Sequence, residues 1–140
     1  MNYLLDTCLI SEFTKRDPNP IVIQWLDSMD EEKLFLSAIT IGEIQHGIQR
    51  LADSKCKNEL LVWMNNGITQ RFGSRILSLE TETMLRWGSL VAEIEKIGHP
   101  MPVMDALIAA TALTHNLVLV TRNVSDFLNC GVQMMNPWEE

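Results

Sequence analysis

The sequence predicts an α/β fold, a three-layer α/β/α sandwich around a central parallel sheet of about five strands. Short apolar segments alternate along the chain with helical segments of about ten to fifteen residues, a pattern typical of parallel sheets covered on both faces. The 140 residues suffice for one core and are too few for two independent ones. No internal repeat or linker interrupts the pattern, so one domain spanning residues 1–140 is expected.

The individual elements follow from apolar runs and their spacing. Strands are expected at 3–5, 34–38, 75–79, 117–121 and 132–135. After the first strand a helical segment runs through Glu12, and a loop covers 17–20. Apolar residues at helical spacing predict helices over 21–29, 40–51, 60–72, 83–97 and 103–115. The last of these is apolar nearly all round, which is typical of an interior helix.

Composition and targeting signals indicate a globular protein of the cytoplasm. With 46% hydrophobic and 21% charged residues, the chain is neither disordered nor of low complexity. Its longest nearly apolar stretch, 103–113, contains Asp105 and is too short to cross a bilayer, and the N-terminus has no basic region of a signal peptide. Three cysteines without a CxxC pair indicate reduced thiols rather than disulfides or a zinc site.

Four acidic residues are expected at one edge of the predicted sheet. Asp6 directly follows the first strand, Glu43 opens the helix after the second, Asp105 lies in the first turn of the apolar helix, and Asp126 follows the fourth strand. Ligands of parallel sheets collect at the carboxyl ends of the strands, where these positions meet. Clustered carboxylates raise one another's pKa, so a divalent cation would stabilise them. Oxygen ligands without His or Cys at ligand spacing suit Mg²⁺, or alternatively Mn²⁺.

The net charge of −7 would by itself argue against a nucleic-acid partner. Acids that hold metal ions are an exception, because two Mg²⁺ ions at the four acids would change the charge from −7 to −3. A Mg²⁺ site of this kind typically serves phosphate chemistry.

Each acid also has a purely structural interpretation, and these alternatives stay open. Asp6 fits the N-cap of the helix that follows it. The spacing Thr40-x-x-Glu43 matches a capping box, in which the glutamate bonds the cap residue's backbone. Asp105 fits an anion favoured by a helix N-terminus, and Asp126 fits a surface acid.

Five segments stand out in order along the chain: LLDTCLISE at 4–12, LSAITIGEI at 36–44, MDALIAATA at 104–112, VTRNVSDF at 120–127 and NPW at 136–138. Together they resemble motifs of the PIN-domain ribonucleases of the VapC/FitB toxin group. The similarity runs nearly end to end, and five ordered matches are far more specific than any one of them.

The resemblance implies a metal-dependent endoribonuclease that is the toxin of a type II toxin–antitoxin pair. It implies that the enzyme hydrolyses RNA with metal-activated water and that a tRNA is the expected substrate. It implies that Asp6, Glu43, Asp105 and Asp126 are the catalytic, metal-binding residues. Implied partners are the RNA substrate and a VapB/FitA-like antitoxin that binds operator DNA. Four Trp and eight Met exceed what a small core needs, so part of the apolar surface is expected to form a homodimer and an antitoxin groove, with core packing as the alternative. Cys8 stands where the family usually has Asn; a thiol bonds its neighbours weakly, which puts the order around Asp6 in doubt.

Three further residues are candidates for substrate binding. Arg122 follows the fourth strand and is placed to meet a phosphate, or is a solvated surface charge. Thr7 and Thr121 each lie beside a strand end, as hydroxyls near the site or as β-branched residues that suit a strand end. Other basic residues would guide RNA or only keep the surface soluble: Arg50, Lys55, Lys57, Arg71 and Arg75.

Three other functions compete with the metal nuclease. The first is metal-free RNA cleavage by His46, His99 and His115, although no motif brings these together. The second is a phosphoacceptor receiver domain, which needs an Asp where this chain has Glu80 and a late Lys that it lacks. The third is a catalytically impaired PIN-like module that binds RNA or a partner without cutting.

Overall fold

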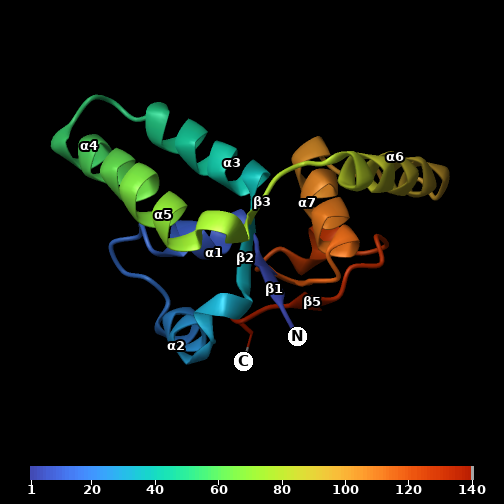
Figure 1. The fold of residues 1–140 in the computed structure, drawn as a ribbon, viewed down its shortest axis with the longest axis horizontal. Helices are drawn as coiled ribbons and strands as arrows, with labels where there is room; N and C mark the ends of the chain where they lie inside the picture. The colour runs from blue at the N-terminus through green and yellow to red at the C-terminus, as the bar shows by residue number, and fades with distance from the viewer. Residues whose placement is uncertain (140) are drawn as a thin grey trace.

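A five-stranded parallel sheet forms the middle layer of the computed structural model, which describes residues 1–139 (Figure 1). Its strands are β1 (Tyr3–Leu5), β2 (Leu34–Ser37), β3 (Ile76–Leu77), β4 (Val118–Val120) and β5 (Met134–Met135). The order across the sheet is β3-β2-β1-β4-β5, and each adjacent pair is parallel. The predicted sheet is confirmed. Its edge strands, β3 and β5, have two residues each and are shorter than predicted.

Helices cover both faces of this sheet, as Figure 1 shows. They are α1 (Thr7–Glu12), α2 (Pro20–Ser28), α3 (Ala38–Gln49), α4 (Lys55–Val62), α5 (Thr69–Phe72), α6 (Thr81–Lys96) and α7 (Val103–Thr114). Leu4 and Leu5 are neighbours in β1 and point to opposite faces, because side chains alternate along a strand. Leu5 belongs to the core that α1 to α5 cover, and Leu4 to the core that α6 and α7 cover.

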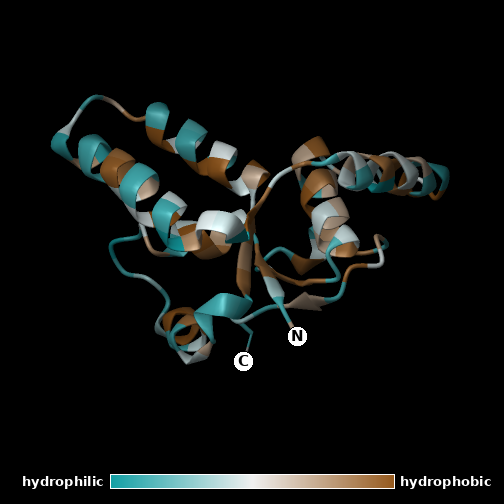
Figure 2. Cartoon of the chain, viewed as in Figure 1, coloured by the Kyte–Doolittle hydropathy of each residue, from teal (hydrophilic) through white to brown (hydrophobic). Residues whose placement is uncertain are grey.

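The distribution of apolar residues follows these layers. Figure 2 shows apolar colour concentrated on β2 and α7 and polar colour on the outer parts of α3 and α4. From Ala106 to Ala112, α7 is buried without interruption, which confirms the predicted interior helix. Across residues 1–139, none of the helices combines the length and apolar character needed to cross a bilayer.

The start of α3 differs from the prediction. The helix begins at Ala38, not at residue 40, because the Ser37 hydroxyl caps it by accepting the Ile39 N–H at 3.0 Å. Thr40 is therefore inside the helix and fully buried, so the capping-box interpretation of Thr40 and Glu43 is wrong. Glu43 does not open the helix but is its sixth residue, free to serve a site at its side.

The helical region predicted over 60–72 starts earlier, at Lys55. Ser54 caps α4 by accepting the Lys57 N–H at 3.1 Å, and the helix continues through a π-helical turn (Trp63–Ile68) into α5. The early part was not predicted because α4 has no buried residue and so lacks an apolar period.

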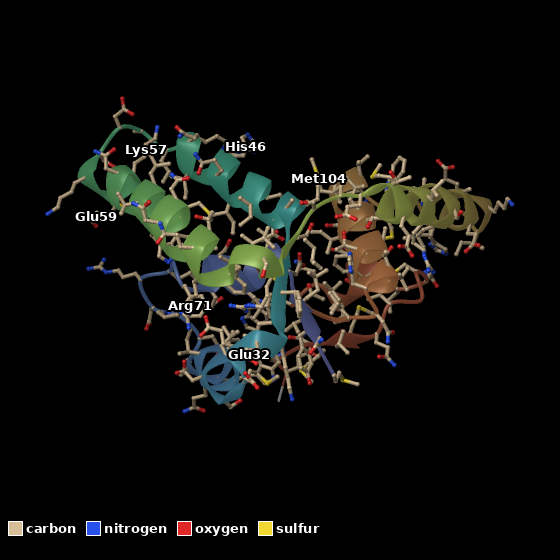
Figure 3. All side chains as sticks on the ribbon, viewed as in Figure 1. Glu32, His46, Lys57, Glu59, Arg71 and Met104 are labelled. Atoms are coloured by element: carbon tan, nitrogen blue, oxygen red, sulfur yellow. The ribbon has the colours of Figure 1, made fainter. Side chains whose placement is uncertain are left out.

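Several basic residues proposed as RNA guides instead hold the structure together. The Lys57 ammonium donates to the carbonyls of Gln49 and Leu51 at the end of α3 (Figure 3). Arg71, in α5, points toward α2 in Figure 3 and donates to the Glu31 carboxylate at 2.6 Å. This hydrogen bond is the main cause of the lowered pKa of Glu31. These cations are thus partly neutralised by bonds within the chain.

Arg75→Ala is expected to lower the free energy of unfolding by about 1–3 kcal/mol. The Arg75 guanidinium donates to the carbonyls of Glu31 and Leu34, at 2.5 and 2.7 Å, and ties the start of β2 to the segment before β3. Urea unfolding measures the change. Lys55→Ala is the matched control because its side chain is 92% exposed, and equal stability of the two variants would contradict the prediction.

Candidate active site

Asp6 lies at the carboxyl end of β1, where the sequence places it. Its backbone N–H donates to the Val120 carbonyl at 2.9 Å, so the sheet itself fixes its main chain. One carboxylate oxygen accepts the Thr7 N–H at 2.8 Å and caps α1, and the other accepts the Thr121 hydroxyl at 2.7 Å. Asp6 is 6% exposed. It is therefore both a helix cap and a buried, oriented carboxylate.

Glu43 is joined to this position through one threonine. The Thr7 hydroxyl, one residue after Asp6, lies 2.6 Å from a Glu43 carboxylate oxygen and 3.2 Å from the Thr40 hydroxyl. Since Thr40 and Glu43 are three residues apart on α3, they lie on the same side of that helix. Thr40 is a supporting residue that the sequence pattern does not predict, because its spacing from Glu43 also fits a capping box.

Asp105 brings the remaining acids into the same neighbourhood. It lies in the first turn of α7, and its pKa is raised from 3.8 to about 6. The causes are burial first and then the negative charges of Asp6, Asp126 and Glu43. Asp126 is exposed and lies on a 3₁₀ turn (Val124–Phe127) that follows β4. Asp105 thus lies within electrostatic reach of each of the other three predicted acids.

The donor set fits a hard divalent cation better than zinc. The four acids offer carboxylate oxygens, which are the ligands that hard cations prefer. Burial and the neighbouring charges favour a proton on Asp105, and a bound cation would take the place of that proton. Within residues 1–139, no three His, Cys, Asp or Glu side chains stand close enough to enclose an ion as they are placed. Like charges repel, so a bound dication would stabilise a closer arrangement of the carboxylates.

Cys8 packs directly against this site. Its sulfur lies 3.8 Å from Asp6 Oδ2, the oxygen that also accepts the Thr121 hydroxyl, and 3.8 Å from that hydroxyl. The sulfur also accepts the Arg122 N–H at 3.5 Å. Burial, followed by the charge of Asp6, raises the pKa of the thiol to about 11, so Cys8 stays protonated. Asp6 is ordered by Thr7 and Thr121, which offsets the weak bonding of a thiol at this position.

The three substrate-binding candidates divide into two kinds. The hydroxyls of Thr7 and Thr121 donate to Glu43 and Asp6, so both are engaged with carboxylates. Arg122 is exposed, and its guanidinium lies 5.8 Å from the centre of the Trp138 ring. Arg122 is therefore the only one of the three candidates with a charge, and its side chain is exposed to solvent.

The three histidines do not form an acid–base pair. His46 is exposed on α3 (Figure 3), His99 precedes α7, and His115 follows it. The twelve residues of α7 separate His99 from His115 by about 18 Å along the helix axis. General acid–base catalysis needs groups within hydrogen-bond reach of one substrate, which this arrangement does not offer.

In the absence of metal, Asp105→Asn is expected to raise the free energy of unfolding by about 1–2 kcal/mol at about pH 7.5. Asp105 is half-buried, so this is about half of what its pKa shift would correspond to without solvent screening. The folded chain binds the proton with a pKa of about 6 and the unfolded chain with 3.8. Wild-type stability therefore rises, and the variant's advantage shrinks, as the pH falls through 6 towards 4.

Urea unfolding at the two ends of this pH range measures both quantities. A variant less stable than the wild type across the range would instead assign Asp105 to capping α7, because the loss of a helix-terminal anion does not depend on repulsion.

Known proteins resemble this chain in sequence and in fold. The family model described as PIN domain matches residues 3–128. Toxin FitB of Neisseria gonorrhoeae is 35% identical over 137 residues, which cover 98% of this chain and 99% of that protein. VapC ribonuclease Y4jK of Sinorhizobium fredii is 31% identical, with 97% of each covered. A solved structure of FitAB bound to an IR36 DNA fragment has a TM-score of 0.94 at 35% identity, covering 99% of this chain and 96% of that one. The chain therefore belongs to the PIN-domain family, in the group that contains FitB and the VapC proteins.

Proposed function

We propose that this protein is a metal-dependent endoribonuclease and the toxin of a toxin–antitoxin pair. One observation carries the proposal: Asp105 is partly buried and feels the negative charges of Asp6, Asp126 and Glu43, from three other segments, which together raise its pKa to about 6. Such a cluster is costly for the fold and suits a divalent cation and phosphate chemistry. Similarity to proteins named toxin FitB and VapC ribonuclease supports the same activity.

The acids Asp6, Glu43, Asp105 and Asp126 would hold Mg²⁺, with Mn²⁺ as the alternative. When bound, the cation would lower the pKa of a water and offset charge on the phosphodiester, so that hydrolysis leaves 5′-phosphate and 3′-hydroxyl ends. Thr121 and Thr7 keep Asp6 and Glu43 in fixed orientations through their hydroxyls. Arg122, on the residue after Thr121, is placed to attract the RNA backbone.

The partners in this proposal are an RNA substrate, with tRNA as the expected class, an antitoxin of the VapB/FitA kind, operator DNA bound through that antitoxin, and a second copy of the chain. An RNA substrate places the activity in the cytoplasm. For the antitoxin we propose a cavity of about 300 Å³, lined by apolar side chains of α1, α2 and the helical segment after α4 and by Asp27, Glu31 and Arg71. It would accept the apolar face of an antitoxin helix. The lining includes Ile10, Leu26, Trp63, Ile68 and Phe72.

The decisive experiment incubates the purified chain with total tRNA in Mg²⁺, in Mn²⁺ and in EDTA, and maps the ends of the products. We expect cleavage with either metal and none in EDTA. Cleavage that persists in EDTA would overturn the metal mechanism and favour the histidines. RNA binding without cleavage in either metal would favour the binding module, the alternative that Cys8 motivates.

A further inference from the structure

A second pocket, of about 290 Å³, lies beside the acidic site, between α1, the start of α2 and the C-terminal segment. Two of the segments that line it are connected to Asp6. Along one wall, α1 runs from its cap Asp6 to Glu12, which lines the pocket. Along the other, Thr121 donates to Asp6 and the next residue, Arg122, lines the pocket. Glu12 is six positions along the helix from Asp6, about 9 Å along its axis, and Arg122 is one residue from the threonine that bonds Asp6.

An aromatic ring and a guanidinium form one side of this pocket. The Arg122 guanidinium lies over the Trp138 ring, 5.8 Å from its centre. Asn136 links the two residues: its side-chain amide donates to the Arg122 carbonyl at 3.5 Å and its oxygen accepts the Trp138 N–H at 2.9 Å. Asn136 therefore ties together the main chains that carry the two side chains, and guanidinium and indole are both planar groups on which a base can stack.

The charges in the pocket are balanced. Glu12 is 2% exposed, and it accepts the Asn19 N–H at 2.7 Å and the Lys15 ammonium at 3.0 Å. Burial alone would raise the pKa of Glu12, but these bonds and the charge of Arg122 outweigh it and lower the pKa, so Glu12 is an anion. With Asp17, the lining carries two cations and two anions. A phosphate gains little from such a pocket, whereas an uncharged planar group does not depend on net charge.

We propose that this pocket binds a nucleobase of the RNA strand, stacked on the Arg122–Trp138 pair, a nucleotide or two from the bond that is cut. The inference rests on the proposed function, since it takes RNA as the substrate. It gives Trp138 and Arg122 the role of binding the base, Asn136 the role of positioning them, and Glu12 the role of fixing Lys15 and the loop at Asn19. Stacking on one aromatic residue typically changes affinity for single strands by about tenfold.

The test compares two fluorescent probes: an oligoadenylate of about ten nucleotides, and a ribose-phosphate oligomer of the same length without bases. Binding is measured in the full chain carrying Asp105→Asn, which prevents cleavage. We expect the oligoadenylate to bind about tenfold more tightly than the abasic oligomer, and Trp138→Ala to remove most of that ratio. Trp138→Phe should keep most of it, and the ratio should persist at high salt because stacking is not a charge effect.

Lys55→Ala is the control, since this exposed cation lies outside the pocket and its loss should leave the ratio unchanged. Trp138 is half-buried and packs against the core, so Arg122→Gln, at an exposed position, provides a variant that keeps the fold. It should lower the ratio at least about threefold. A ratio that neither variant changes would overturn the proposal.

Two further readouts separate this proposal from the proposed function. If wild-type chain cuts tRNA and Trp138→Ala cuts it with the same KM, the base pocket is wrong and the nuclease stands. If the wild type does not cut RNA, the proposed nuclease function is wrong, and the ratio of the two affinities still tests whether the pocket binds a base. If Trp138→Ala weakens the complex with the antitoxin and leaves RNA binding unchanged, the pocket is a protein contact and the proposal is overturned.

Discussion

Asp6→Asn is expected to lower the rate of metal-dependent RNA cleavage by about a thousandfold or more, while the chain stays folded. An amide keeps the size of the side chain and one oxygen that can still accept the Thr7 N–H. The amide removes the negative charge that would hold the cation. It also removes the second carboxylate oxygen, which accepts the Thr121 hydroxyl. A loss of about 4 kcal/mol of transition-state stabilisation, within what a bound metal supplies, corresponds to this factor.

Glu43→Gln and Asp105→Asn should have effects of the same order, because all three acids act on one cation and their effects are not additive. Initial rates on a mapped tRNA site, together with circular dichroism, measure the effect. Asp53→Asn is the matched control, since its side chain is fully exposed and pairs only with Lys57 at 3.3 Å. If Asp6→Asn retains more than about a tenth of wild-type activity, Asp6 is a helix cap and not a metal ligand.

Thr121→Val is expected to lower the cleavage rate, or raise the Mg²⁺ concentration it requires, by about ten- to a hundredfold. The Thr121 hydroxyl is fully buried and donates to Asp6 at 2.7 Å while accepting the Asn123 N–H at 3.0 Å. Valine has nearly the same shape without the hydroxyl, so it removes the donor that orients Asp6. Groups that hold a metal ligand in place typically have effects of this size.

Thr111→Val is a close control for this experiment. Thr111 is equally buried, and its hydroxyl donates within α7 to the Leu107 carbonyl at 2.8 Å, away from the acids. Both variants should lose about 1 kcal/mol of stability, and only Thr121→Val should lose activity. Thr121→Ser should restore the Mg²⁺ response. Equal activity of the two valine variants would show that the hydroxyl at Thr121 serves stability alone.

Much of the fold could be predicted from local patterns. The strand at Tyr3–Leu5 and the helix at Val103–Thr114 are signalled by apolar runs that neighbouring residues determine. The start of α3 was misplaced by two residues because Ser37 and Thr40 are both good cap residues, and only the path of the chain out of β2 selects Ser37. The first five residues of α4 were not predicted, because the helix is exposed there and leaves no apolar period.

The sequence by itself determined the succession of strands and helices and the presence of an acid after β1, in α3, at the start of α7 and after β4, because periodicity and position along the chain are local properties. The tertiary structure decided which hydroxyl serves which carboxylate, how far the pKa of Asp105 rises, and that Trp138 lies against Arg122. Those contacts join residues from 16 to 115 positions apart. They depend on strand order and burial, which are properties of the packed chain and of no single segment.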